Sequence, residues 1–195
     1  TYRRRIRRVS KIGVTIEEAR DPAFADEYYD QLEAVFERQQ LAPPYGRDRV
    51  TRLLASVAGT GRLLLLRARD AAGRCIATAI FPAMNDTMYF WGGATARDCG
   101  RAHPNEAVHW YAMRYWKQRG IKRYDMGGAG EYKRKFGAYE IAVPWFRTSR
   151  YPGLPMMREA VRRVFAWRQI VVGKAHHLRG YVPSLPIPLS SPSER

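Results

Sequence analysis

The 195-residue sequence has little cysteine and no long apolar run. Cys75 and Cys99 are too few for the disulfide framework of a small secreted fold, and neither lies in a CxxC or Cys/His spacing typical of zinc sites. No stretch reaches the roughly 18 apolar residues of a membrane-spanning helix. These absences favour a chain in a reducing compartment that relies on its own hydrophobic core, and the length is most simply one domain.

Acidic residues are also scarce, with 18 Asp and Glu against 34 Lys and Arg and a formal net charge of +16. Only six of the basic residues are Lys. This excess favours an anionic partner, and RNA, the pyrophosphate of a nucleotide cofactor and an anionic membrane surface all remain open. Arginine scattered over every surface would give the same totals, so charge alone does not choose between partners.

Alternating strand and helix periodicities predict a single α/β domain over residues 14–150. Helices are expected over 3–11, 21–40, 46–59 and 103–120, strands over 14–19, 62–70, 74–84, 87–95, 121–128 and 139–150, and a short helix over 130–137. A helix between two strands of one sheet implies a parallel pair, so the sheet is mixed and mostly antiparallel. Gly92 and Gly93 predict a bulge or a close backbone approach, and Pro144 places the last strand at an edge or a bulge.

Three further segments flank this domain. Residues 1–13 are interpreted as a basic linker from a preceding half that this chain lacks, and 183–195 have the Pro/Ser composition of a disordered tail. Residues 151–182 predict an amphipathic helix, whose apolar side either packs on the domain or lies on anionic lipid. That side includes Met157, Val161, Val164, Phe165 and Val172.

Three stretches carry a resemblance to a known family: "RRRIRRVSKIGVTI", the run from "YFWGG" to "YDMGG" with "HPNEAVHW" between, and "YKRKFG". The order of elements is similar to the GNAT acyltransferase fold, and the combination resembles the Fem-type aminoacyltransferases, which look like two GNAT halves in tandem. The resemblance covers most of residues 1–150. It implies direct transfer of an aminoacyl or acyl group to an amine of a cell-envelope precursor, on the cytoplasmic side of the membrane.

The resemblance also implies catalytic residues. Lys133 matches the functional Lys of the family, and Tyr132 matches its aromatic position. A cation aimed at the developing oxyanion lowers the barrier, and a phenol can protonate a leaving thiolate or stack on the terminal adenine of a tRNA. Asp125 and Glu131 are the nearest carboxylates able to take the proton of the attacking amine, although Asp125 is expected rather to satisfy backbone groups at the strand end. A solvated helix face remains the alternative for Lys133, and core packing for Tyr132.

A second candidate site is "RDCGRA", which satisfies the R-x-x-G-x-A pattern of acyl-CoA-dependent GNAT enzymes. Arg97, Gly100 and Ala102 are therefore the candidate cofactor-binding residues, presenting backbone N–H groups to a pyrophosphate. Asp98 adds negative charge at this place, and Pro104 removes one N–H group. These departures favour an aminoacyl-tRNA donor over acyl-CoA, and neither donor would be bound permanently.

Other chemistries find less support. The four histidines, His103, His109, His176 and His177, have no spacing of a metal site, so no metal is expected. A non-catalytic module that binds RNA or membranes through its arginines is the alternative from another functional class. Its binding would follow total charge and ignore Lys133. A peripheral contact with the inner face of the membrane is compatible with either class.

Overall fold

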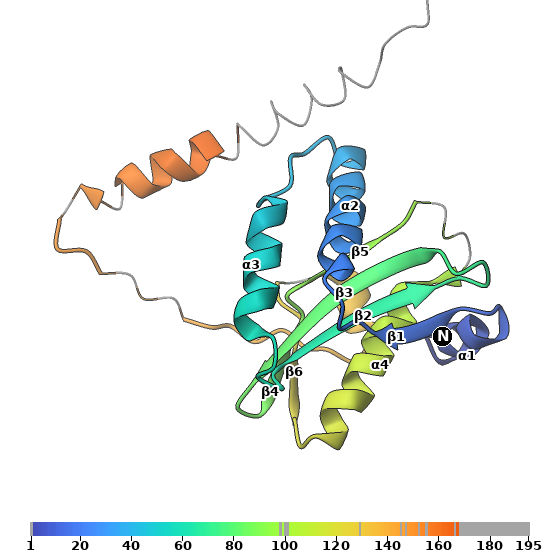
Figure 1. The fold of residues 1–195 in the computed structure, drawn as a ribbon. Coiled ribbons are helices and arrows are strands. Elements are labelled where there is room, and N and C mark those ends of the chain that lie inside the picture. Colours follow the sequence, from blue (N-terminus) through green and yellow to red (C-terminus); the bar gives the residue numbers. More distant parts are fainter. Residues whose placement is uncertain are drawn as a thin grey trace, which may run out of the picture.

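The computed structural model describes residues 2–97, 99, 102–128, 130–144, 146, 148–151, 153–154, 156–165 and 167. A six-stranded mixed sheet lies at the centre, with helices on both of its faces (Figure 1). The helices are α1 (Tyr2–Lys11), α2 (Ala23–Arg38), α3 (Arg47–Val57), α4 (Pro104–Gln118) and α5 (Glu131–Arg134). The strands are β1 (Thr15–Glu18), β2 (Leu63–Arg69), β3 (Cys75–Met84), β4 (Thr87–Tyr89), β5 (Gly92–Thr95) and β6 (Arg123–Asp125).

The sheet runs in the order β1-β2-β3-β4-β6, and β5 also pairs with β3. Strands β1 to β4 pair antiparallel, whereas β4 and β6, which are joined through α4, pair parallel. The predicted α/β fold with a mixed, mostly antiparallel sheet is therefore confirmed. The two parallel strands bring the end of β6 next to the end of β4, where the candidate site lies.

A bulge divides the strand that was expected over 87–95. Three residues between Met88 and Gly92 stand opposite two residues of β3, so β4 and β5 pair with β3 in different registers. A Cβ atom on Gly92 would overlap the hydroxyl oxygen of Tyr28, and one on Gly93 would lie 3.2 Å from the Thr78 carbonyl oxygen. The predicted close approach is confirmed at both glycines, and the bulge lies just before them, at residues 89–91.

Each face of the sheet has its own apolar core. On one face α2 and α3 bury Phe24, Leu32 and Val50. On the other face α4 packs through Val108 and Trp116, and α1 adds its one buried apolar residue among those described, Val9. Periodic apolar residues thus hold α2 and α4 against opposite faces, as their sequence patterns predicted.

The basic segment at the start of the chain forms α1, which confirms the helix predicted over 3–11. Val9 is almost fully buried against the sheet, and the Arg5 guanidinium lies 2.7 Å from a carboxylate oxygen of Glu106 on α4. Arg4, Arg7, Arg8 and Lys11 are exposed, and α1 is strongly amphipathic. Val9 and the ion pair of Arg5 with Glu106 thus hold α1 in place, and the exposed face of α1 is basic.

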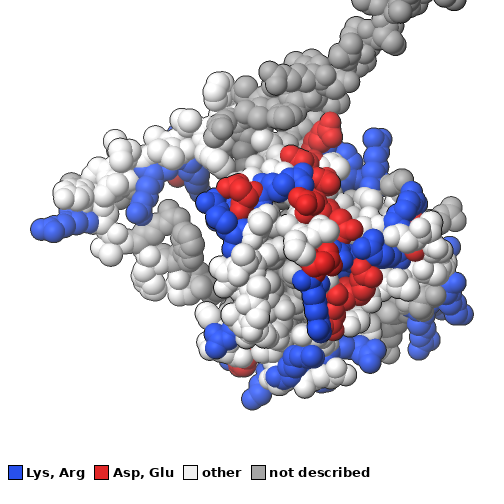
Figure 2. Space-filling view, viewed as in Figure 1, with Lys and Arg blue, Asp and Glu red and all other residues white. Residues whose placement is uncertain are grey.

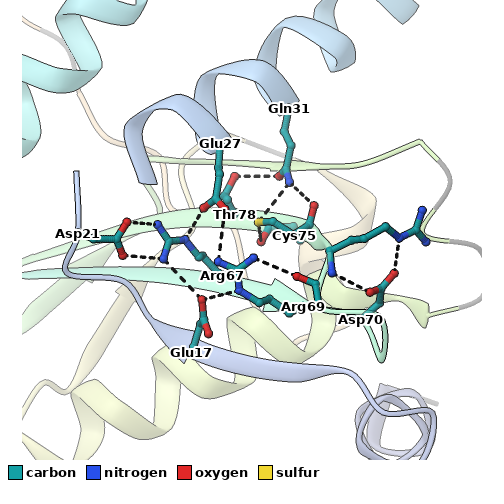
Figure 3. Close-up of polar contacts among 12 residues, drawn as sticks. Glu17, Asp21, Glu27, Gln31, Arg67, Arg69, Asp70, Cys75 and Thr78 are labelled. Atoms are coloured by element: carbon teal, nitrogen blue, oxygen red, sulfur yellow. Dashed lines mark hydrogen bonds and ion pairs between the residues drawn. The ribbon is translucent and has the colours of Figure 1, made fainter. Parts of the chain in front are cut away.

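A buried ion-pair network ties β1 and β2 to α2 (Figure 3). Arg67 of β2 is only 5% exposed, and its two terminal nitrogens donate to Asp21 at 2.7 Å each. The same guanidinium pairs with Glu27 of α2 and lies 3.5 Å from Glu17 of β1. This bidentate contact lowers the pKa of the Asp21 carboxyl to about 2. Three carboxylates from separate segments thus converge on one arginine.

The strand predicted over 139–150 is wrong. The described residues of this segment pair with no strand, and the side chains of Tyr139, Ile141 and Phe146 are exposed, Phe146 by 92%. Pro144 has no N–H to donate to a ladder, and no buried surface receives the apolar side chains. Alternating apolar residues alone therefore did not produce a strand here.

The C-terminal helix is confirmed in part. Residues 156–165 and 167 are helical and stand away from the sheet (Figure 1). The rest of the helix expected over 151–182, from 168 onward, and the tail expected over 183–195 lie outside the described residues.

Candidate active site

The parallel strands β4 and β6 separate after three residue pairs. Tyr89 stands opposite Asp125, and the next backbone bond runs from the Phe90 N–H to the Asp125 carbonyl at 2.9 Å. Beyond this bond β5 pairs with β3 alone among the described strands, while the chain after β6 turns into α5. One edge of β5 therefore lacks a partner strand, and such an edge can pair with the amide groups of a bound ligand.

An aromatic cluster fixes the loop between α2 and α3 to the bulge. The hydroxyls of Tyr28 and Tyr45 lie 2.9 Å apart, and the Trp91 ring packs 5.2 Å from the Tyr45 ring and 6.1 Å from the Tyr28 ring. Burial raises the pKa of both tyrosines, so both are neutral at pH 7. The cluster lines the start of β5 with fixed, uncharged surface.

On the other flank of the site, α4 places His109 against the sheet. His109 is 4% exposed, its Nδ1 lies 2.5 Å from the Tyr124 hydroxyl of β6, and the rings of Phe90 and Phe136 pack at 4.7 and 5.3 Å. Burial, and after it the charge of Lys133, lowers the pKa of His109 to about 4. Burial raises the pKa of Tyr124. The two side chains therefore form a neutral, hydrogen-bonded pair at pH 7.

The short helix α5 presents Tyr132 and Lys133 at the end of β6. Lys133 donates from Nζ to the carbonyl of Gly128, and Nζ lies 5.6 Å from the centre of the Tyr132 ring. Within the described part of the chain, no carboxylate forms an ion pair with Lys133. An ammonium has three donors, so Lys133 retains donors for an oxygen that becomes negative during a reaction.

Asp125 is the last residue of β6, and its side chain bonds to the backbone of the turn that follows. Its carboxylate accepts the N–H of Gly127 at 2.7 Å, and Gly127 adopts a positive φ of 74° that favours glycine. The contact fixes the turn that carries the chain from β6 toward α5. Asp125 is exposed, so its second oxygen can still reach a substrate.

The loop between β5 and α4 holds the other predicted site. Arg97 is exposed, whereas Ala102 is buried and donates its N–H to the Cys99 carbonyl at 3.2 Å. Gly100 lies outside the described residues, as does Asp98. The Ala102 N–H is thus occupied by the protein itself. Pro104 begins α4 without an N–H.

The structure places Lys133 beside Tyr132, and the turn after β6 links both to Asp125, because Gly127 donates to the Asp125 carboxylate and Gly128 accepts from Lys133. Sequence reasoning missed His109 and Tyr124, which lie behind them. A lone histidine near the apolar side of a helix gave little signal, since its partner comes from β6 and is met only in the folded chain.

Two properties of the described residues bear on chemistry and location. No group of three or more His, Cys, Asp or Glu side chains among them could hold a metal ion. In the same part of the chain, no helix is long and apolar enough to cross a membrane.

Comparison with known proteins assigns the family. The family model described as an acetyltransferase (GNAT) domain matches residues 1–134. The chain belongs to the GNAT acetyltransferase domain family. Comparison with curated proteins gave no match. This membership agrees with the GNAT part of the resemblance seen in the sequence.

Solved structures share this fold at low identity. FemX superposes with a TM-score of 0.60 at 13% identity, over 87% of this chain and 52% of that one. An aminoglycoside acetyltransferase from an uncultured soil metagenomic sample gives 0.54 at 14% identity, over 73% and 99%. An aminoglycoside 6'-N-acetyltransferase from Acinetobacter haemolyticus gives 0.53 at 12% identity, over 70% and 99%. This GNAT chain spans about half the length of FemX.

Proposed function

We propose that this GNAT domain transfers an acyl or aminoacyl group to a primary amine, with the reacting carbonyl held between β5 and α5. The observation that carries the proposal is the placement of Lys133. Its ammonium lies at the end of β6, bonded to a backbone carbonyl rather than to a carboxylate, where the parallel strands part. A cation placed in this way is suited to developing negative charge.

The residues can divide the chemistry as follows. The amine attacks the donor carbonyl and forms the new C–N bond, and the carbonyl oxygen becomes an oxyanion that Lys133 stabilises. The proton of the amine passes to water or to the exposed carboxylate of Asp125. The tetrahedral species then expels the leaving oxygen or sulfur, which takes a proton from the Tyr132 hydroxyl. Tyr132 regains that proton from solvent, since its ring is half-exposed.

The neutral pair of His109 and Tyr124 positions this site. It joins α4 to β6, and the His109 ring also packs on Phe136, one turn beyond Lys133. Because the imidazole stays neutral, it adds no positive charge beside the ammonium of Lys133. We therefore assign His109 a positioning role rather than an acid–base role.

An aminoacyl-tRNA is the preferred donor, and a cell-envelope precursor is the preferred acceptor, as in the Fem-type enzymes that the sequence resembles. The net charge of +16 exceeds what one small cofactor needs. The occupied N–H of Ala102 and the missing N–H of Pro104 weaken the loop that would hold a CoA pyrophosphate. On this proposal the enzyme works in the cytoplasm together with a preceding GNAT-like half.

An acyl-CoA-dependent N-acyltransferase is the second candidate. Family membership favours it, since GNAT acetyltransferases take acyl-CoA as donor, and Arg97 is exposed on the loop that the R-x-x-G-x-A pattern marks. The two donors differ physically. Many tRNA phosphates give an affinity that falls steeply with salt, whereas one pyrophosphate held by backbone N–H groups gives a shallow dependence.

A transfer assay at several salt concentrations tests the proposal. The intact protein is given an amine acceptor with either aminoacyl-tRNA or acetyl-CoA, and donor binding is titrated in parallel. We expect turnover with aminoacyl-tRNA and a steep loss of its affinity as salt rises. Turnover with acetyl-CoA alone would select the second candidate. RNA binding without transfer from either donor, unchanged by Lys133→Ala, would indicate a non-catalytic module.

A further inference from the structure

The helix at residues 156–167 carries an apolar stripe that nothing in the described structure covers. At about 100° per residue its apolar side chains fall on one half of the helix circumference. Val161 and Val164 are each 62% exposed and Met157 is 61% exposed, so the stripe is not packed on the sheet. The apolar residues of this helix are Met156, Met157, Ala160, Val161, Val164, Phe165 and Trp167.

The opposite half of this helix is basic. It carries Arg158, Arg162 and Arg163, and its one acid is Glu159. Glu159 accepts from Arg162 at 3.0 Å and from Arg163 at 3.4 Å, which leaves a net positive flank beside the apolar stripe. An apolar stripe bordered by arginine is typical of helices that lie in a lipid interface.

The segment that joins the helix to the domain continues the apolar surface. The described residues of 139–146 pair with no strand, and their exposed side chains include Tyr139, Val143 and Phe146. Water-exposed apolar side chains over two successive segments are unusual in a monomeric domain and mark an interaction surface.

Neither the domain itself nor a second copy of the chain is a suitable partner for the apolar stripe of this helix. The candidate binding place on the domain is a cleft of about 590 Å³ between α1 and α4, but its lining includes Arg114 and Arg119 against one carboxylate, that of Glu18. Ile6 and Val9 form its α1 wall, and the helix that carries them is rich in arginine and has no acidic residue. A basic helix would meet like charge there. A second copy of the chain brings its own net charge of +16, so it is disfavoured for the same reason.

We infer that the helix at 156–167 lies on an anionic lipid surface, with its apolar stripe in the interface and its arginines at the headgroups. Charge complementarity selects this occupant, since anionic headgroups attract the arginines while the acyl region receives the apolar side chains. The inference does not rest on the proposed reaction, because the helix stands away from the sheet (Figure 1) and contributes no residue to the candidate site.

Vesicle co-sedimentation of the full chain tests the inference. The probes are vesicles of phosphatidylcholine alone and of phosphatidylcholine mixed with phosphatidylglycerol. We expect binding to the mixed vesicles only, weakened by salt. Val161→Ser with Phe165→Ser should lower the partition coefficient about tenfold or more, and Arg162→Gln with Arg163→Gln should lower it about tenfold.

Matched variants elsewhere complete the experiment. Arg20→Gln with Arg52→Gln removes the same charge from exposed positions, and Met84→Ser removes an exposed apolar side chain. Both should bind mixed vesicles like the parent chain. Equal binding by all variants, or by both vesicle types, would overturn the inference. So would a drop in melting temperature or the loss of a dimer in the Val161 and Phe165 variant, since these would mean that protein covers the stripe.

Discussion

Cations at the two ends of this sheet differ in the charge of the groups that surround them. At the β1 end Arg67 is buried among Asp21, Glu27 and Glu17, and Figure 3 shows these carboxylates arriving from separate segments. At the β6 end Lys133 is only half-buried, and its hydrogen-bond acceptor is the carbonyl of Gly128. One cation is surrounded by opposite charge, whereas the other has a neutral partner.

The acidic residues follow the same division. On the face seen in Figure 2 most acidic side chains gather in one band, where they alternate with basic ones. Arg47, for example, pairs with both Asp26 and Asp30 of α2. A cation whose charge is neutralised by carboxylates contributes to the native structure, and a cation left without them can act on a substrate. We therefore expect the β1 end to determine stability and the β6 end to determine turnover.

Replacing Arg67 should give the largest effect and should change stability alone. Arg67→Leu leaves the Asp21 carboxylate without its bidentate partner and leaves Glu17 and Glu27 with Arg69 alone, so the free energy of unfolding should fall by about 3 kcal/mol. The turnover of the folded fraction should not change. Urea unfolding and a transfer assay measure the two. Arg52→Leu, at an exposed pair on α3, should cost less than about 0.5 kcal/mol and serves as the control.

Replacing Lys133 should instead lower turnover and leave stability almost unchanged. Lys133→Ala should lower kcat/KM by about 10²-fold or more, because the oxyanion loses its cation, while the melting temperature barely changes. Lys135→Ala, which removes an exposed Lys just after α5, should keep normal turnover. Equal losses in the two variants would mean that the site senses only the total charge of this segment.

The free energy of unfolding should depend on pH through the lowered pKa of His109. In the unfolded chain its pKa is near 6.5, and in the folded chain it is about 4. As the pH falls from 6.5 toward 4, the unfolded state binds a proton that the folded state rejects. Stability should therefore drop by about 2 kcal/mol over this window. His109→Gln should remove this part of the drop, whereas His103→Gln, at a half-exposed position, should leave it intact. Identical pH profiles for the two variants would contradict the neutral buried pair.

The smallest expected effect concerns the Tyr132 hydroxyl. Tyr132→Phe keeps the ring for stacking but removes the proton, so kcat should fall about tenfold while KM for the donor stays constant. Tyr139→Phe, at an exposed position beyond α5, is the matched control. A raised KM with normal kcat would assign the ring to donor binding instead.

Much of the fold could be predicted from local pattern. The apolar spacing of α2 and α4 and the paired glycines at the bulge each depend on residues close in sequence, and the structure confirms them. The segment 139–150 shows the limit of such patterns. Its alternating apolar residues satisfy the periodicity of a strand, but pairing needs an adjacent edge and free N–H groups, which the local sequence does not specify.

The sequence by itself determined the order of elements as far as α5, the GNAT family resemblance and the identity of Tyr132, Lys133 and Asp125 as candidates, because motif and periodicity are local properties. Only the tertiary structure decided which charges are neutralised. The pairing of His109 with Tyr124 joins residues of α4 and β6, and the bidentate contact of Arg67 with Asp21 joins residues 46 apart along the chain. Partners at such distances depend on how the sheet packs, and this packing is what separates the stabilising cations from the candidate catalytic one.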